Sequence, residues 1–388
     1  MANVLTDLAA DIYVAADVVG RELVGFIPAV TINANGSERA AKGDVVRAAF
    51  TRESTVGDVS ESMTIPEGTD QTVDNKTLTI DKSRAVQIPF TGEDVLHLNN
   101  GVGYETVYGD MIAQAMRALT NEMEVEIATQ AKNSASRAFG TAGTTPFGSN
   151  FNEVAELRQI LVDNGMPPND GQASLVLNTL AGTNLRQLAT LQSVNQAGND
   201  TLLRQGTLLD LQGLAVRESA QVQSHTKGAG AGYDVNNGSG EVVGQTTITL
   251  DGGTVNTTGI IAGDIVTFAG DSINKYVVNT GLVATAGDIV IGAPGIRSTV
   301  ADAAEMTIGN DYTANVAFHR RAIELAVRAP AVPEGGDNAD DAITVQDPNS
   351  GIVYEIRFYK GYRKAMIEVS VAFGVKCWKS DFIATLLG

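Results

Sequence analysis

The chain has one cysteine and three histidines among its 388 residues, and this scarcity excludes several kinds of site. The single cysteine, Cys377, cannot form an internal disulfide, as expected of a protein made in a reducing cytoplasm. It stands beside Trp378 near an apolar strand, so we expect a small core residue and not a nucleophile. His97, His225 and His319 lack the spacing of metal ligands, and no P-loop pattern is present. We therefore predict no catalytic residues, no metal site and no cofactor, in a chain that is not an enzyme.

Long apolar runs and positive charge are also scarce. No stretch approaches the roughly 18 apolar residues of a membrane helix, and the N-terminus has neither the basic nor the apolar region of a signal peptide. Lys and Arg total 27 against 45 Asp and Glu, which gives a net charge of −18. Binding to nucleic acid needs clustered basic side chains, and the densest basic stretch, 359–364, is typical of a solvated turn. We expect no membrane partner and only weak, non-specific contact with DNA.

Acidic residues are abundant, and two groups of them could bind cations. Glu122 and Glu126 are four residues apart on a predicted helix, with Glu124 between them. Because no histidine accompanies them, we expect these carboxylates to face solvent or basic residues of a neighbouring subunit, and not a metal. The acidic loops 53–74 and 333–341 lack the pattern of a calcium loop, which indicates solvated surface.

Hydrophobic periodicity predicts a mixed α+β chain. Apolar residues at steps of three and four predict a short helix within 4–26 and a long one over 103–137, which would be roughly 50 Å long. Apolar alternation predicts a closing hairpin with one buried face, in which Glu355 and Arg357 alternate with apolar residues and Lys360-Gly361 makes the turn. Strands are also predicted at 45–50, 77–80, 86–90, 173–177 and 213–217, and a helix at 153–164.

Residues 222–315 have a different composition from the rest of the chain. Glycine clusters there, together with Asn, Thr and Val, and short strand patterns alternate with turn residues. This pattern predicts a small β-barrel or sandwich that folds autonomously with its two ends close together. The glycine-rich stretch 228–232 opens no helix after a strand, so we expect a flexible loop and no phosphate site. The core predicted for this segment consists of Ile248, Leu250, Ile265, Phe268, Val277 and Ile289.

Five stretches resemble the major capsid (coat) proteins of tailed bacteriophages, which have the Hong Kong 97-type fold; they are 21–28, 98–101, 136–147, 317–325 and 359–364. The chain is most similar to the coat proteins of short-tailed Salmonella-type phages, which carry an inserted β-barrel. The resemblance implies an α+β fold with the following parts: an N-arm (1–44), an extended β-hairpin loop with flanking strands (45–90), a spine helix and peripheral domain (91–149), an axial domain (150–221), an inserted β-barrel (222–315), and the remaining axial and peripheral sheet (316–388).

The function implied by this resemblance is that of a major capsid protein. Such a protein assembles in the bacterial host cytoplasm into pentamers and hexamers, which form the icosahedral virion shell around double-stranded DNA. The implied partners are other copies of the chain, a scaffolding protein, a portal protein and, as a further option, decoration proteins. One alternative is an encapsulin-like nanocompartment shell. Another is a secreted β-rich enzyme or adhesin, which is disfavoured by an aromatic content of only 5% and by the missing export signal.

Overall fold

The computed structural model describes residues 15–16, 19, 25–51, 58–59, 61–65, 73–99, 104–193, 210–347 and 349–388. Most of the predicted helix at 4–26 and most of the acidic stretch 53–74 lie outside these residues. The described chain is a strand-rich α+β fold built from two large sheets and a few helices.

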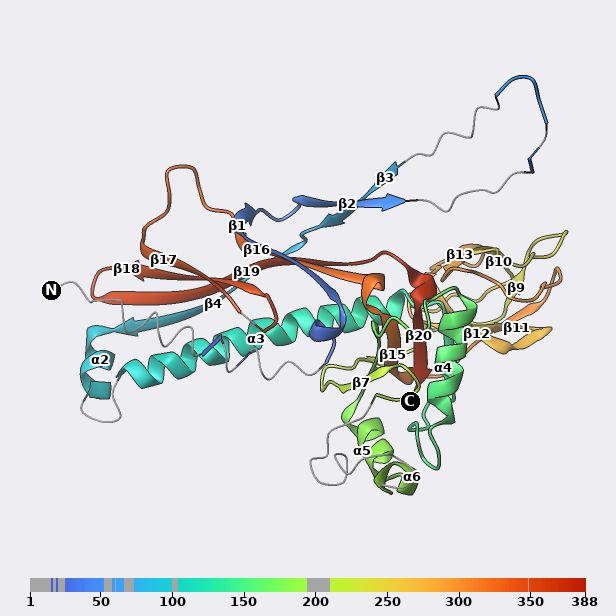
Figure 1. The fold of residues 1–388 in the computed structure, drawn as a ribbon, viewed down its shortest axis with the longest axis horizontal. Helices are drawn as coiled ribbons and strands as arrows, with labels where there is room; N and C mark the ends of the chain where they lie inside the picture. The colour runs from blue at the N-terminus through green and yellow to red at the C-terminus, as the bar shows by residue number, and fades with distance from the viewer. Residues whose placement is uncertain are drawn as a thin grey trace.

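A long helix packs along one face of the first sheet (Figure 1). Helix α3 spans Tyr104–Asn133, and a row of its apolar residues at steps of three and four is buried: Ile112, Met116, Leu119, Met123 and Ile127. The sheet has the order β1 (Thr31–Ala40), β16 (Ile323–Pro330), β19 (Lys364–Cys377), β18 (Val353–Lys360) and β17 (Ala339–Gln346), and β4 (Lys82–Thr91) also pairs with β19. Short α2 (Gly92–Asn99) connects β4 towards α3, and η1 (Ile27–Ala29) precedes β1.

The predicted long helix is too long at its C-terminal end. It stops at Asn133, and residues Arg137–Gly140 form strand β5. This strand pairs in parallel with β20 (Ile383–Leu387) at the other end of the sequence, with Arg137 opposite Ala384. The sequence up to Arg137 contains no Gly or Pro, so the local pattern predicts that the helix continues. Pairing with β20 instead makes residues 137–140 a strand.

The second sheet forms an α/β body around the end of α3. Its central strands are β5, β20, β15 (Tyr312–His319), β6 (Ala173–Leu177) and β7 (Ala215–Glu218), and β8 (Ser224–His225) pairs with β15. The helices of this part are α4 (Asn152–Asp163), α5 (Thr179–Gln187) and α6 (Ala189–Gln192), with single turns η2 (Arg320–Ala322) and η3 (Ser380–Phe382). The predicted strand at 173–177 and helix at 153–164 are confirmed in type and to within one residue.

The strands from β9 to β14 close into a ring. They are β9 (Tyr233–Val235), β10 (Thr247–Asp251), β11 (Ile265–Phe268), β12 (Asp271–Thr280), β13 (Gly287–Ile291) and β14 (Glu305–Ile308). They pair in the order β11-β14-β9-β10-β13-β12, and β11 also pairs with β12, which closes the barrel. The barrel is joined to the body because β12 also pairs with β5, with Tyr276 opposite Arg137. The segment begins and ends side by side, since Tyr312 lies opposite His225.

The barrel has an apolar core of its own, but the predicted membership is only partly right. Ile248, Leu250, Phe268 and Ile289 pack inside it, together with the ring of Tyr233. Ile265 and Val277 instead belong to the large core of the body. Because both side chains pack with the core of the body, the barrel is attached through apolar as well as backbone contacts.

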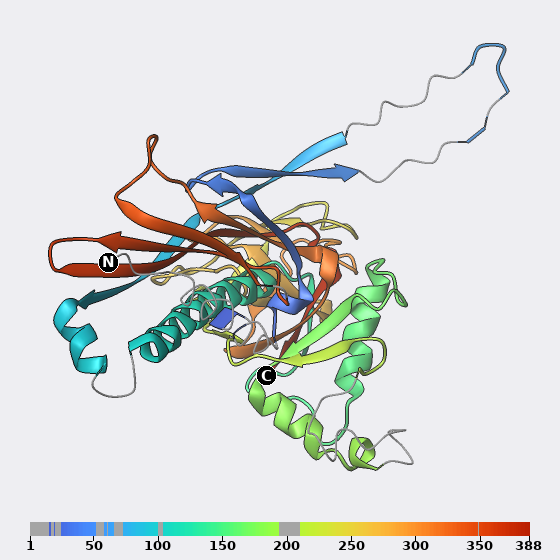
Figure 2. The same cartoon turned by 60° about the vertical axis from the view of Figure 1, so that its left-hand side comes forward.

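Strands β2 (Val45–Thr51) and β3 (Val73–Thr79) form a two-stranded ribbon that extends away from the body in both views (Figures 1 and 2). Among the described strands these two pair only with each other, from Val45 opposite Thr79 to Thr51 opposite Val73. A ribbon of two strands is marginally stable in water without further packing.

The closing hairpin forms as predicted between β18 and β19, but both of its faces are covered. The turn is at Gly361, whose N–H donates to the Lys364 carbonyl (2.8 Å). Glu355 and Arg357, predicted on an open face, are only 1% and 6% exposed. The bulge of β1 places Arg39 over this face, and the loop before β17 places Asp337 there as well. Glu355 and Arg357 are therefore buried together with these two residues.

Candidate functional site

The histidine and acidic side chains that could take part in catalysis or metal binding do not cluster in the described part of the fold. His225 and His319 each pair with a carboxylate, Asp264 and Asp170, at 2.8 Å and 2.7 Å, while the His97 side chain lies outside the described part of the chain. Within the described ranges, no three His, Cys, Asp or Glu side chains come close enough together to hold a metal ion. No helix that the structure describes is long and apolar enough to cross a membrane.

The acidic residues of α3 have partners within the same chain. Glu122 accepts a hydrogen bond from Nε of Arg84 (2.6 Å), and Glu126 is paired with Lys82. The prediction that they face solvent holds in part for Glu122, whose side chain is 35% exposed, but the sequence did not show that β4 brings both cations alongside the helix within the same chain. Glu124 points the other way and is buried, where it accepts from the Phe26 N–H (2.8 Å) and the Ser219 hydroxyl (3.1 Å). Burial raises the pKa of Glu124, and these two hydrogen bonds oppose that rise.

The acidic loop 333–341 is held by basic side chains and is only partly a solvated surface. Asp337 pairs with Arg357 and accepts from the Tyr359 hydroxyl (2.8 Å). Arg357 in turn donates to Glu355 (3.1 Å), which also accepts from Arg39 (2.6 Å). The four charges form a chain across β18, in which Glu355 is the acceptor shared by two arginines.

The glycine-rich stretch 228–232 is packed, contrary to the expectation of a flexible loop. The Gly228 N–H donates to Asp264 (3.0 Å), and the Gly230 N–H donates to the Gly259 carbonyl (2.9 Å). A Cβ atom on Gly228 would lie 2.2 Å from the Gly259 oxygen. Glycine is needed here because two backbone segments touch, and not because the loop needs freedom.

The Cys377 thiol should react slowly. Burial raises its pKa to about 11, and hydrogen bonds to Ser134 and the Lys379 backbone offset only part of that rise. Because the thiolate is the nucleophile, we expect alkylation by iodoacetamide at neutral pH to be at least about 100-fold slower in the folded than in the urea-unfolded chain. Mass spectrometry of the labelled protein measures both rates, and equal rates would contradict the assignment.

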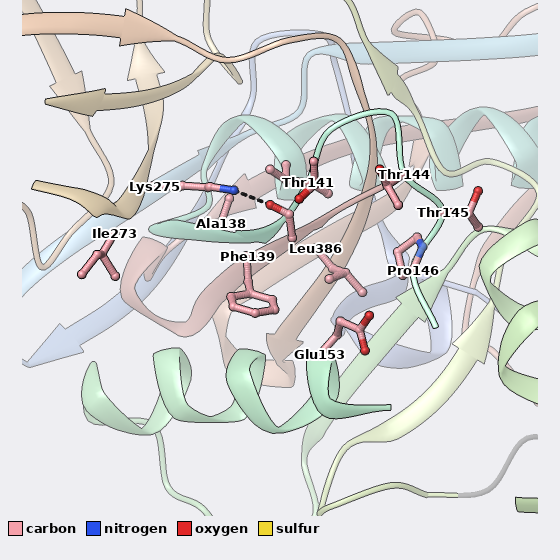
Figure 3. A pocket seen from close by; sticks show the side chains of 12 residues that line it. Ala138, Phe139, Thr141, Thr144, Thr145, Pro146, Glu153, Ile273, Lys275 and Leu386 are labelled. Atoms are coloured by element: carbon pink, nitrogen blue, oxygen red, sulfur yellow. Dashed lines mark hydrogen bonds between the residues drawn. The ribbon is translucent and has the colours of Figure 1, made fainter. Parts of the chain in front are cut away.

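A cavity of about 400 Å³ lies between β5, β20, β12 and the start of α4 (Figure 3). Its floor is apolar, with Phe139 and Leu386, and Lys275 and Glu153 lie at its two ends. The Lys275 ammonium already donates to the Gly140 carbonyl, and Oε2 of Glu153 is buried without a hydrogen-bond partner.

The most unusual surface is in the segment that continues the β2–β3 ribbon. Val59, Met63 and Ile65 have relative exposures of 99%, 108% and 90%. Asp58 and Glu61 lie among them and are exposed as well. Apolar side chains this exposed are typical of a surface that binds another protein.

A second surface, at the opposite end of the molecule, combines an apolar groove, which Asp94 and Asp110 also line, with a basic turn. A groove of about 690 Å³ runs between β4 and α3 and is lined mainly by apolar residues, among them Ile88, Phe90 and Met111. The β18–β19 turn lies beside it, since Lys364 pairs with Thr91 and Ala365 with Phe90. That turn carries Lys360, Arg363 and Lys364, and its Tyr362 is 91% exposed. Figures 1 and 2 place this turn and the described segment beyond the β2–β3 ribbon on opposite sides of the molecule.

Similarity to known proteins is detectable only at the level of structure. No protein-family model matches the sequence, and no curated protein is significantly similar to it. The solved capsid structure of cyanophage P-SCSP1u matches with a TM-score of 0.50 and 11% identity, over 94% of this chain and 88% of that one. The chain has a phage capsid fold.

Other solved structures match this capsid fold less closely. A structure of Mycobacterium phage Che8 has 14% identity and a TM-score of 0.49, covering 94% of this chain and 90% of that one. A virus-like particle from Pyrococcus furiosus has 7% identity and a TM-score of 0.44, covering 98% and 99%.

Sequence reasoning identified some of these features and missed others. The projecting segment was predicted from its acidic, apolar-poor composition, and the structure places its described residues beyond the ribbon. Neither the partners of Glu122 and Glu126 nor the buried pairing of His225 with Asp264 was predicted. Partners that are this far apart in sequence leave no periodic signal, so only a three-dimensional structure could reveal them.

Proposed function

We propose that this chain is the major capsid protein of a tailed phage, forming pentamers and hexamers of an icosahedral shell around double-stranded DNA. The observation that supports this most is the match to a phage capsid structure over 94% of the chain. Scaffolding and portal proteins are the expected assembly partners, and decoration proteins are a further option. The expected place of the protein is the virion shell, after assembly in the host cytoplasm.

The parts of the chain fit the roles of a Hong Kong 97-type subunit. Residues 1–44 would be the N-arm, 45–90 the extended loop, and 91–149 the spine helix α3 with the peripheral domain. Residues 150–221 would be the axial domain, 222–315 the inserted barrel, and 316–388 the remaining axial and peripheral sheet. The β2–β3 ribbon supports the second role, because only its base packs on the body and a two-stranded ribbon is marginally stable by itself.

The two surfaces suggest how neighbouring subunits join. The acidic and apolar segment at 58–65 of one copy would bind the apolar groove and basic turn of the next. A contact between two different surfaces of identical chains is heterologous, and repeated around an axis it closes into a ring. With a net charge of −18 per chain, copies repel one another, so we expect this contact to need moderate salt to screen the repulsion.

The alternative function is that of an encapsulin-like nanocompartment shell. The inserted barrel favours the phage assignment. The two proposals differ in what the shell contains, which is packaged DNA for a phage and a cargo enzyme for a nanocompartment.

The purified chain, produced together with a scaffolding protein, should form closed hollow shells. Electron microscopy and sedimentation velocity would detect them as uniform particles far larger than a monomer. A preparation that is folded by circular dichroism but contains only monomers and dimers under all salt conditions would contradict the proposal.

A further inference from the structure

The cavity described above lies where the barrel, the body and helix α4 meet (Figure 3). Its residues come from β5, from the turn that follows β5, from the start of α4, from β12 and from β20. Its volume of about 400 Å³ lies in the lower part of the range for pockets that bury small ligands, roughly 300–1,000 Å³. The space therefore suits one side chain or one small molecule, and not a whole helix.

The walls of this cavity are held together by hydrogen bonds. Strand β5 pairs with β20 on one side and with β12 on the other. The turn after β5 is fixed as well, because the Gly143 N–H donates to the Gly388 carbonyl (3.1 Å) and the Asn184 amide donates to the Pro146 carbonyl (3.1 Å). A cavity with fixed walls is preorganised, so binding of a ligand requires little ordering of the protein.

The acidic end of the cavity is short of hydrogen-bond donors. Among the described residues, Oε1 of Glu153 accepts one long bond from the Phe147 N–H (3.4 Å), and Oε2 accepts none. A carboxylate can accept about four hydrogen bonds, so this one can accept further donors. Glu153 lies in the first turn of α4, where the positive end of the helix dipole favours a negative charge. The cavity therefore offers an anion to a cation that enters it.

The basic end of the cavity has donors left over. The Lys275 ammonium has three N–H groups, and the described part of the chain uses one of them, which donates to the Gly140 carbonyl. The other two can donate to an acceptor that enters the cavity. Phe139 and Leu386 lie between the two ends and form the apolar floor (Figure 3). A ligand that fits has a cation at one end, an apolar middle and a hydrogen-bond acceptor at the other end.

A lysine or arginine residue of a polypeptide has these three features in this order. Its cation would pair with Glu153, its methylene stem would lie on the apolar floor, and its own backbone carbonyl would accept from Lys275. The net charge of −18 makes copies of the chain repel one another, whereas a basic protein is attracted. We propose that this cavity binds a lysine or arginine side chain of a basic partner protein.

The bound side chain would contact the barrel and the body at once. Strand β12 belongs to the barrel, and β5, β20 and α4 belong to the body, so the partner would brace the two parts against each other. This site is separate from the groove between β4 and α3, and it does not depend on the proposed shell.

Titration of the unassembled full-length chain with blocked amino acids tests the proposal. The probe is N-acetyl-arginine methylamide, and the matched control is N-acetyl-norleucine methylamide, which has an alkyl side chain without the cation. Methyl NMR signals of Ile273 and Leu386, which line the cavity, report binding. We expect saturable shifts with the arginine probe and at least about tenfold weaker binding of the norleucine control. Equal binding of the two, or no saturable shift, would overturn the proposal.

Two variants assign the binding to the cavity. Glu153→Gln keeps the size of the side chain and an acceptor for the Phe147 N–H but removes the charge, so the arginine probe should bind at least about tenfold more weakly. Glu156→Gln removes the same charge from an exposed position of the same helix, so this control should bind the probe as the wild type does. Unaltered binding in Glu153→Gln, or an equal loss in Glu156→Gln, would also contradict the assignment.

Sedimentation velocity of the same proteins distinguishes a basic partner from a second copy of the chain. Self-association of the wild type that Glu153→Gln abolishes and Glu156→Gln retains would assign the cavity to another copy, and would overturn the choice of a basic partner. Sedimentation that is the same for the wild type and both variants supports that choice.

Discussion

Replacing Glu355 with glutamine should lower the free energy of unfolding by about 3–5 kcal/mol, the usual cost of removing one partner from a buried charge group. Glu355 is 1% exposed and accepts from Arg39 at 2.6 Å and 3.0 Å and from Arg357 at 3.1 Å. Without its charge, the Arg357 guanidinium would stay buried with Asp337 as its only charged partner in this group, while Arg39 would turn towards solvent. Urea unfolding of the unassembled chain measures the effect.

A matched control for this variant is Glu122→Gln. Glu122 also pairs with an arginine at 2.6 Å, but the side chains of Arg84 and Glu122 are 52% and 35% exposed. Surface pairs contribute about 1 kcal/mol or less, so this variant should differ little from the wild type. Similar losses for the two variants would show that burial of Glu355 is not what makes its charge important.

Shell formation should be abolished when residues 52–72 are replaced by Asn-Gly. Thr51 and Val73 are a paired position at the open end of the ribbon, so a two-residue turn can join them without disturbing β2 or β3. The described residues of the body and barrel lie outside 52–72, so we expect the melting temperature of the monomer to be unchanged. Electron microscopy of the variant, co-produced with scaffolding protein, should show no closed particles.

Point variants distinguish the effect of the length of this segment from the effect of its exposed apolar side chains. The triple variant Val59→Ser, Met63→Ser and Ile65→Ser keeps the chain length and should also fail to assemble. The control is Ile273→Ser, because Ile273 is equally exposed at 91% but lies on the barrel. Normal shells from the triple variant would refute the proposed role of the exposed apolar side chains.

The sequence predicted elements whose pattern is local. Helix α3 and the β18–β19 hairpin follow from apolar periodicity, and strand β6 follows from a short, continuously apolar run that is buried at every position. Strand β5 was missed, since residues 137–140 become a strand only by pairing with β20 and β12. The burial of Glu355 and Arg357 was missed for a related reason. Their alternation with apolar residues predicts an open polar face, but it cannot show that Arg39 and Asp337 cover that face.

The functional surfaces were predictable to a similar extent. A long acidic stretch between two strands indicates a projecting loop whatever its partner is. The groove between β4 and α3 is different, because it exists only where an edge strand and a helix from separate parts of the sequence meet. The pairing of His225 with Asp264 likewise depends on two segments brought together by the closed barrel.

The way β5 and β20 are joined has a consequence for synthesis of the chain. Ser136 and Ile383 are hydrogen-bonded although 247 positions separate them, whereas every strand of the barrel lies between Tyr233 and Ile308. Contacts of long sequence separation form late, and domains with local contacts fold first on the ribosome. We expect the barrel to fold while the apolar strands of the body still lack their pairing partner, residues 383–387. During that interval the nascent chain is exposed to aggregation.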